Sequence, residues 1–258
     1  MTLVPPVVLH HGLFGFGNIR IGPFPLRYFA GRIERAITEM GHPLIIARCH
    51  PTGPIELRAR QLKQLIIRDR QSLRRANESV IILAHSLGGL DARYMVTHLG
   101  MADRVQAIVT LATPHRGSSY ADWVVQNLGD RLGGKSLISK LGIDLRALAD
   151  LTTGSMATFN SQTPNAPGVD YFSVAGVQNA SKCAPFLLHS HSVVFRCEGE
   201  NDGVVSLNSA KWGQFLGTWP TDHLHIINKR FTPESLLPRH DVTARYTAIL
   251  ETVLGRQA

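Results

Sequence analysis

The sequence predicts an α/β fold in which a mostly parallel central sheet is flanked by helices. Short apolar segments alternate with longer segments whose apolar residues recur at helical spacing, a pattern typical of parallel sheets. The chain has 258 residues, of which 44% are hydrophobic, and this is enough to bury such a sheet in one domain. We therefore expect a single domain over residues 1–258.

Strands and helices alternate without interruption up to residue 112. The expected strands are short apolar runs, and each expected helix has one apolar face that can pack on the sheet. In the second helix this face carries Ala59, Leu62 and Ile66. The predicted elements are, in chain order, strand 6–10, helix 26–40, strand 43–48, helix 55–75, strand 79–84, helix 87–99 and strand 105–112.

Residues 117–168 interrupt this alternation before a further strand, which is expected at Val169–Ala175. We expect a helical insertion here, and two interpretations stay open: ordinary helices packed on the open end of the sheet, or a mobile cap (lid) over it. A terminal helix over Asp241–Leu254 completes the predicted fold. Apolar residues recur at helical spacing in two clusters of the insertion: Tyr120, Trp123 and Val124, then Ile138, Leu141, Leu145 and Leu148.

A serine between small residues follows the strand expected at 79–84. Ser86 lies at the point where this apolar strand would turn into a helix. In such a strand-turn-helix elbow the serine adopts a strained backbone conformation, and small residues two positions away on each side let strand and helix approach closely. Ala84 and Gly88 meet this requirement, although glycine is commoner than alanine at the first position. Ser86 is therefore a candidate nucleophile.

A serine hydroxyl needs a base to accept its proton and an acid to orient that base. In α/β folds that present serine on an elbow, the chain order is serine, acid, histidine. Asp202 lies in an Asn-Asp-Gly turn 116 residues after Ser86, and His223 follows 21 residues later. We therefore expect Asp202 to be the acid and His223 the base.

Several other residues compete for both roles. Asp202 is favoured among the acids because it is expected at a sharp loop tip beside a strand end. Among the bases, His225 would point to the opposite face from His223 if the segment is extended, so only one of the two can reach Ser86. The alternatives are three acids and two histidines: Asp170, Glu198, Glu200, His225 and His240.

Acyl transfer at a serine also requires backbone N–H donors aimed at the oxyanion that forms during the reaction. The first expected strand runs into Gly12, which lets the backbone turn so that the N–H of Leu13 faces the nucleophile. The N–H of Leu87, directly after Ser86, is the second expected donor. We assign no proton transfer to His10 or His11, because polar residues are ordinary at a strand end.

Five motifs in this order resemble those of the bacterial true lipases and related carboxylesterases of the α/β-hydrolase fold. They are HGLFG at 11–15, AHSLGG at 84–89, ATPHRGS at 112–118, NDGVV at 201–205 and DHL at 222–224. The resemblance implies an α/β-hydrolase fold with a helical cap or lid within residues 117–168. It also implies the site residues: Ser86 as nucleophile, Asp202 as acid, His223 as base, and Leu13 and Leu87 as oxyanion-hole donors.

The resemblance further implies a serine hydrolase that cleaves carboxylic esters through an acyl-enzyme and without a cofactor, with acylglycerol-type esters as the preferred substrates. A thioesterase or polyester hydrolase with the same triad is the alternative hypothesis. A non-catalytic binding member of the fold is a third hypothesis. If the insertion forms a cap, its inner faces would line an acyl-chain pocket.

One position departs from the family pattern. Many such lipases hold a structural calcium ion through an acidic residue two positions after the catalytic histidine. Here that position is His225, and imidazole is a poor ligand for a hard cation. We therefore expect no metal site.

The formal net charge of +8 raises the question of an anionic partner. Many basic residues fall in the helix expected at 55–75, where they would face solvent opposite the apolar stripe. This run has no interleaved aromatic residues that could stack on bases, so we expect no nucleic-acid partner. An ester or lipid substrate and a transient contact with a lipid interface remain compatible with the charge.

No apolar stretch reaches the roughly 18 to 20 residues that a transmembrane helix needs, and the first ten residues lack the basic start of a secretion signal. We therefore expect no membrane span. The sequence does not fix the location, and the cytoplasm is preferred. Cys49, Cys183 and Cys197 are odd in number and widely separated, which favours reduced, buried thiols over a disulfide framework.

Overall fold

The computed structural model describes residues 4–15, 19–21, 24–72, 79–129, 145–231 and 241–255. Within these ranges the centre is a six-stranded sheet in the order β4-β1-β5-β6-β7-β8, in which every neighbouring pair is parallel. The predicted parallel α/β sheet is thereby confirmed. The strands are β1 (Val7–His10), β4 (Leu44–Ile46), β5 (Val80–His85), β6 (Val105–Leu111), β7 (Asp170–Gly176) and β8 (Gln214–Trp219).

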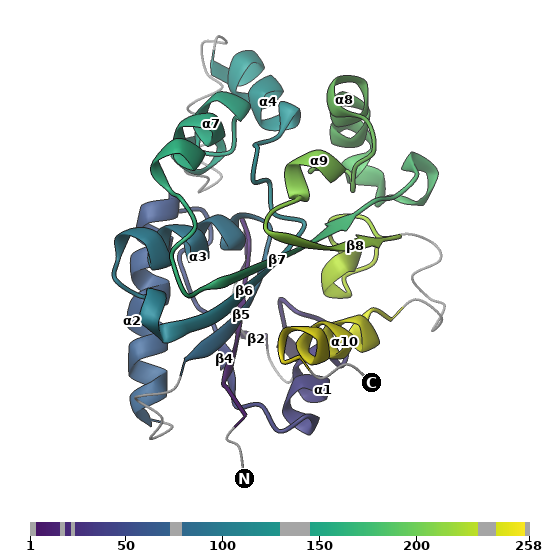
Figure 1. Ribbon diagram of the computed structural model, residues 1–258. Coiled ribbons are helices and arrows are strands. Elements are labelled where there is room, and N and C mark those ends of the chain that lie inside the picture. The colour runs from purple at the N-terminus through teal and green to yellow at the C-terminus, as the bar shows by residue number, and fades with distance from the viewer. Residues whose placement is uncertain are drawn as a thin grey trace.

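Helices cover both faces of this sheet (Figure 1). On one face lie α2 (Ile55–Ser72) and α3 (Leu87–His98), and on the other lie α1 (Ile33–Glu39) and α10 (Thr243–Val253). Because side chains alternate along a strand, β5 sends Ile82 into the core beneath α2 and α3 and Leu83 into the core beneath α1 and α10. The two faces of the sheet therefore have separate apolar cores.

Further helices gather at one end of the sheet. In Figure 1, α4, α7, α8 and α9 lie together beyond the strands, and α4 follows the carboxyl end of β6. Of the described helices, α4, α6 and α7 fall in the expected insertion at 117–168. The apolar residues Ile138 and Leu141 of this insertion lie outside the described residues. The bounds are α4 (Ser119–Gly129), α6 (Leu145–Ala149), α7 (Thr153–Gln162), α8 (Leu188–Glu198) and α9 (Leu207–Ala210).

The helix expected at 26–40 is wrong in its first half. A two-stranded antiparallel pair, β2 (Ile19–Ile21) and β3 (Phe24–Leu26), precedes it, and α1 begins only at Ile33. Gly31 has a φ of +66°, a left-handed conformation that ends any helix approaching from the amino side. Short 3₁₀ turns complete the description: Ala102–Arg104, Ala180–Lys182, Pro185–Leu187 and His225–Ile227.

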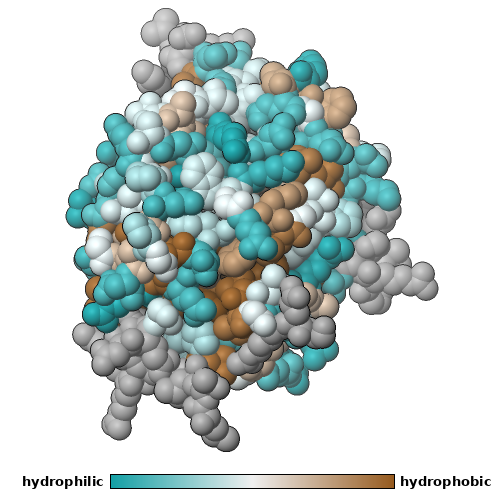
Figure 2. Space-filling model, in the orientation of Figure 1, coloured by the Kyte–Doolittle hydropathy of each residue, from teal (hydrophilic) through white to brown (hydrophobic). Residues whose placement is uncertain are grey.

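The surface is mostly polar on the face shown in Figure 2, where a band of apolar side chains crosses the centre. Among the described helices, none is both long enough and apolar enough to cross a bilayer. All three cysteines are free thiols. Cys49 and Cys183 are buried as expected, whereas Cys197 is exposed.

Candidate active site

Ser86 occupies the turn between β5 and α3 in a conformation that few non-glycine residues adopt. Its φ is 55° and its ψ is −131°. Strain of this kind costs about 1–3 kcal/mol and persists only where the surroundings hold it. Here the Ser86 N–H donates to the Leu111 carbonyl at 2.9 Å, and the Thr113 hydroxyl donates to the Ser86 carbonyl at 2.7 Å. Both backbone groups of the serine are therefore fixed by β6 and the loop after it.

The elbow closes because its neighbours are small. A Cβ placed on Gly88 would lie 2.8 Å from the His11 carbonyl oxygen, and one placed on Gly12 would lie 2.6 Å from the Ser86 Cβ. Both distances are shorter than carbon contacts allow, so side chains at these positions would push the loop after β1 away from the serine. Ala84 is fully buried, and its methyl group is accommodated where glycine is commoner.

Residues 86, 202 and 223 come together at this elbow. The His223 Nε2 atom lies 3.0 Å from the Ser86 Oγ, and its Nδ1 atom lies 2.7 Å from the Asp202 Oδ2. Because a carboxylate can only accept, Nδ1 carries the proton, and Nε2 is left to accept the serine hydroxyl proton. This is the geometry that a nucleophile, a base and an orienting acid require.

Asp202 is held by its own turn. The Asp202 Oδ1 accepts the N–H groups of Val204 at 2.9 Å and Val205 at 2.8 Å, while the other oxygen faces His223. The side chain is fully buried. Its backbone carbonyl also accepts the His223 N–H at 2.8 Å, so side chain and main chain of the aspartate both position the histidine.

The alternative acids lie elsewhere. Asp170 is exposed at the amino end of β7, opposite the end that carries the elbow. Glu198 accepts hydrogen bonds from the Ser119 N–H and the Ser206 hydroxyl, so it joins the start of α4 to the start of α9. Glu200 is exposed. None of them is hydrogen bonded to His223 among the contacts of the described chain.

The segment after His223 is not extended, so the reason given for preferring His223 over His225 is wrong. Residues 225–227 form a 3₁₀ turn, not an extended segment, so strand alternation does not apply to them. It is His223 and not His225 that lies at hydrogen-bonding distance from Ser86. The other candidate base, His240, lies outside the described residues.

The loop after β1 and the start of α3 present the candidate oxyanion-hole donors. The N–H groups of Gly12, Phe14 and Gly15 donate to the Tyr28 hydroxyl, the Pro51 carbonyl and the Gly12 carbonyl. In the described part of the chain, no acceptor contacts the N–H of Leu13 or that of Leu87, which begins α3. These two donors are therefore available to a ligand atom beside Ser86.

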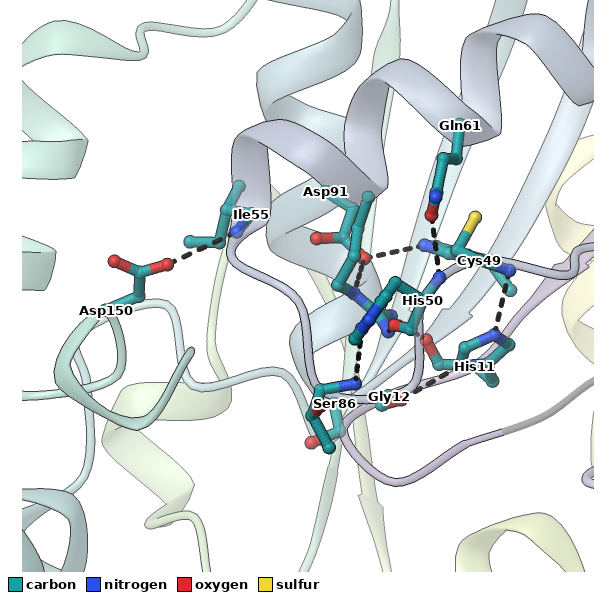
Figure 3. A network of polar contacts seen from close by, with 12 residues as sticks. His11, Gly12, Cys49, His50, Ile55, Gln61, Ser86, Asp91 and Asp150 are labelled. Carbon is teal, nitrogen blue, oxygen red and sulfur yellow. Dashed lines mark hydrogen bonds and ion pairs between the residues drawn. The ribbon is translucent and has the colours of Figure 1, made fainter. Parts of the chain in front are cut away.

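A buried charged network lies beneath this loop on the α2 and α3 side (Figure 3). The Asp91 Oδ2 accepts from the Arg58 Nε at 2.8 Å and lies 2.7 Å from the His10 Nε2. Arg58 also donates to the His11 carbonyl at 2.5 Å and to the His50 carbonyl at 2.6 Å. Burial lowers the pKa of His10, and burial with the nearby His10 and Arg58 lowers the pKa of His11 to about 3. Arg58 thus joins the start of the oxyanion loop to the segment after β4.

An apolar cluster adjoins the two donors. Leu13 and Leu87 pack together with residues from α3 and the helices that follow β6. The cluster contains Ile55, Leu90, Ala121, Leu151, Met156 and Phe159. The helices between β6 and β7 therefore place apolar side chains against the oxyanion-hole residues.

Sequence reasoning missed three residues of this site. Asp222 is buried, and its carboxylate accepts the N–H groups of Leu224 and His225 and, on its other oxygen, that of Ala184. Tyr28 and His85 are also buried and hydrogen bond to the oxyanion loop and to the His223 backbone. The position of His85 directly before the serine was a signal for a site role, whereas nothing in the sequence marks Tyr28.

The grouped side chains of Ser86, His223 and Asp202 can supply a nucleophilic oxygen and transfer its proton. In the ranges that the structure describes, no three His, Cys, Asp or Glu side chains are grouped so that they could hold a metal ion. The carboxylate of Asp222, next to the candidate base, is occupied by backbone N–H groups.

Sequence comparisons connect the chain to lipases. Over 213 residues it is 33% identical to triacylglycerol lipase 2 of Saccharomyces cerevisiae, covering 79% of this chain and 63% of that protein. It is 29% identical over 285 residues to a triacylglycerol lipase of Pseudomonas fragi, covering 91% of this chain and 94% of that one. The chain thus spans just under two thirds of the yeast relative and nearly all of the bacterial one.

Solved structures agree with this placement. The mature lipase BlEst2 of Bacillus licheniformis superposes with a TM-score of 0.73 at 25% identity, covering 97% of this chain and 93% of that chain. The lipase of Staphylococcus hyicus has a TM-score of 0.75 at 16% identity, covering 98% and 96%. The expected α/β-hydrolase fold and the likeness to bacterial lipases are confirmed.

Residues 26–174, more than half of the chain, match the family model described as the PGAP1-like alpha/beta domain, and the protein belongs to that family.

Proposed function

We propose that the protein is a carboxylic ester hydrolase, a lipase or esterase acting on acylglycerol-type esters through a covalent acyl-enzyme. The observation that carries the proposal is the hydrogen-bonded series from the Ser86 hydroxyl through His223 to Asp202. The lipase relatives and structural neighbours support the same reaction class. The catalytic roles of the individual residues are part of this proposal.

The proposed reaction has two steps. His223 accepts the Ser86 proton at Nε2 while the Ser86 Oγ attacks the ester carbonyl carbon, and the resulting imidazolium gives that proton to the leaving alcohol. Water then attacks the acyl-enzyme with His223 again as the base, which releases the carboxylic acid and regenerates the serine hydroxyl. Asp202 keeps the Nδ1 proton of His223 in place throughout.

The N–H groups of Leu13 and Leu87 would stabilise the negative charge on the carbonyl oxygen in both steps. One well-placed donor of this kind contributes about 3 kcal/mol to the transition state. Because both donors are backbone groups, changing the Leu13 or Leu87 side chain should alter the shape of the pocket more than the charge stabilisation.

The acyl chain would lie against the apolar cluster that Leu13 and Leu87 share with the helices between β6 and β7. We propose that these helices, within residues 117–168, form a cap over the site. Contact with a lipid interface is supported by large apolar side chains that are exposed near this end of the molecule: Phe14, Trp123, Val125, Phe186 and Leu188. No nucleic-acid partner is proposed.

Labelling by a fluorophosphonate tests the proposal. The reagent should modify the wild-type protein at one site, and Ser86→Ala should abolish labelling, because the reagent reacts with an activated serine in an oxyanion hole. Ser192→Ala, at an exposed serine on α8, is the control and should label normally. An unreactive wild-type protein with correct folding would reject the assignment.

A substrate panel distinguishes the reaction classes that share this triad. Hydrolysis of glycerides of increasing acyl length should exceed that of acyl thioesters and polyesters. Measurement below and above the solubility limit of each ester also tests the cap, because a mobile cap predicts a rate increase when an interface is present. Preference for thioesters or polyesters would replace the acylglycerol proposal and leave the triad in place.

A further inference from the structure

A second series of buried hydrogen bonds connects the three loops of the candidate site. The Gly12 N–H donates to the Tyr28 hydroxyl oxygen at 3.1 Å. That hydroxyl lies 2.7 Å from the His85 Nδ1, and the His85 Nε2 lies 2.9 Å from the His223 backbone carbonyl. Tyr28 and His85 are both almost completely buried, so water does not compete for these bonds.

The direction of every proton in this series follows from its ends. The His223 carbonyl can only accept, so the His85 Nε2 must carry a proton and donate. Burial, followed by the nearby His223, holds the pKa of His85 well below its usual value, so the ring is neutral and Nδ1 is a bare acceptor. The Tyr28 hydroxyl then donates to Nδ1, and its oxygen accepts the Gly12 N–H. All three bonds run from the oxyanion loop toward His223.

The series fixes the two backbone segments whose placement decides the chemistry. The Gly12 N–H belongs to the peptide unit directly before the one that carries the Leu13 donor, so its bond to Tyr28 fixes the backbone from which that unit extends. The carbonyl of the donor's own unit, that of Gly12, accepts the Gly15 N–H at 3.1 Å. At His223 the N–H donates to the Asp202 carbonyl and the carbonyl accepts from His85. Both backbone polar groups of the candidate base are thereby anchored, one to the acid loop and one to the residue that precedes the nucleophile.

We infer that Tyr28 and His85 are positioning residues, which hold the Leu13 donor and the His223 imidazole in register with the Ser86 hydroxyl. The inference rests on the proposed esterase function. Neither side chain contacts the Ser86 Oγ in the described hydrogen bonds, so neither is called catalytic. A displacement of about 1 Å at such groups lowers turnover by about a hundredfold, which sets the scale of the expected effects.

Two substitutions test the inference. Tyr28→Phe removes the hydroxyl and leaves the Gly12 N–H and the His85 Nδ1 without partners, so kcat on a short soluble ester should fall by about ten- to a hundredfold while KM changes little. His85→Leu should lower kcat at least as much. His85→Gln supplies one uncharged donor and one acceptor, and it should recover part of the loss.

Matched controls separate positioning from stability. Tyr171→Phe removes a buried hydroxyl that likewise accepts a backbone N–H, that of Ala166 at 2.8 Å, but on β7 away from the elbow. His42→Leu removes a buried histidine that bonds to the Pro5 carbonyl. Both should lower the melting temperature with kcat unchanged at temperatures where the protein is folded.

Two further readouts complete the test. A boronic acid that mimics the tetrahedral intermediate should bind Tyr28→Phe more weakly by the same factor as the fall in kcat/KM, whereas affinity for the product acid should stay constant. The double variant Tyr28→Phe with His85→Gln should lose less than the product of the single losses, because both act in one series.

The outcomes distinguish the inference from the proposed function. An active wild-type enzyme whose Tyr28→Phe and His85→Leu variants keep full kcat, or whose losses match those of the two controls, overturns the inference and leaves the esterase function standing. A folded wild-type protein without ester hydrolysis overturns both. If Tyr28→Phe does not fold, the test is the comparison of kcat between His85→Gln and His85→Leu. Equal kcat in these two variants overturns the inference.

Discussion

Two buried polar networks flank the nucleophile on opposite faces of the sheet, and they differ in charge. Beneath α2 and α3 the network contains the ion pair of Arg58 and Asp91 with His10 beside it. On the face covered by α1 and α10, Tyr28 and His85 form a series that carries no charge. Strand alternation separates the two, because His85 continues the row of Leu83 while Ile82 and Ala84 face the other side.

Proximity to the base accounts for this difference. The ring centroids of His85 and His223 are 4.7 Å apart, and His223 becomes a cation during the proposed reaction. At that separation a second positive charge would oppose the imidazolium by about 3–4 kcal/mol at an effective dielectric constant of about 20. The neutral network therefore adjoins the base, while the charged network holds backbone carbonyls of the oxyanion loop and of the segment after β4.

The largest expected effect is an acid-dependent loss of stability. Burial lowers the pKa of His10, His11, His85 and His115, so the unfolded chain binds more protons than the folded one below the ordinary histidine pKa of about 6.5. The free energy of unfolding should therefore fall as the pH decreases below that value. At about pH 5.5 each fully shifted histidine accounts for about 1.4 kcal/mol, and the four together for about 6 kcal/mol. Urea unfolding between these pH values measures the loss.

Single substitutions then compare the two networks. Asp91 raises the pKa of His10 and so offsets part of its burial, whereas the strongest influences on His85 both lower its pKa. His85→Gln should therefore remove at least as much of the pH dependence as His10→Gln. If His10→Gln removed more of the pH dependence than His85→Gln, the charged network and not the neutral one would contribute more to the acid sensitivity.

A smaller effect on stability is expected from breaking the charged network. Arg58→Leu leaves Asp91 buried without its cation, and such a loss costs about 3–5 kcal/mol. Changing both residues to Leu removes the uncompensated charge and should recover part of that loss, although the carbonyls bonded by Arg58 stay unpaired. Chemical denaturation at constant pH gives the values.

The exposed helix pair of Arg35 and Glu39 is the matched control. Arg35→Leu should leave the denaturation midpoint unchanged, because solvent screens this pair. If Arg58→Leu changed the denaturation midpoint as little as Arg35→Leu, the buried ion pair would not stabilise the oxyanion loop. The two networks would then differ in their residues but not in what they stabilise.

The sequence predicted the parts of this site that depend on local steric rules. Small residues around Ser86 and the Asn-Asp-Gly turn at Asp202 indicate an elbow and a loop tip from neighbours in the chain alone, and the structure brings both to His223. The seven-residue α1 was harder to predict, because Gly31 ends any longer helix through its backbone conformation.

The neutral network could not be predicted in the same way. Tyr28 and His85 are 57 residues apart, and they meet only because the chain before α1 returns to the face of β5. No periodicity or spacing encodes that return. The error about His225 has a different, local origin: the Asp222 carboxylate accepts the N–H groups of the residues two and three positions further on, and the chain after His223 turns instead of staying extended.

The smallest expected effect concerns a polar contact outside both networks. Asp122 on α4 accepts the N–H and the hydroxyl of Thr153 at the start of α7, each at 2.9 Å, and is only half-buried. Losing such a helix-terminal bond costs about 0.5–2 kcal/mol. Asp122→Ala should therefore lower the melting temperature slightly. It should leave kcat on a short soluble ester unchanged, because the contact joins two helices above the site and anchors neither the oxyanion loop nor His223. A fall in kcat comparable with that of Tyr28→Phe would mean that the helices between β6 and β7 position the catalytic groups as strongly as the buried networks do.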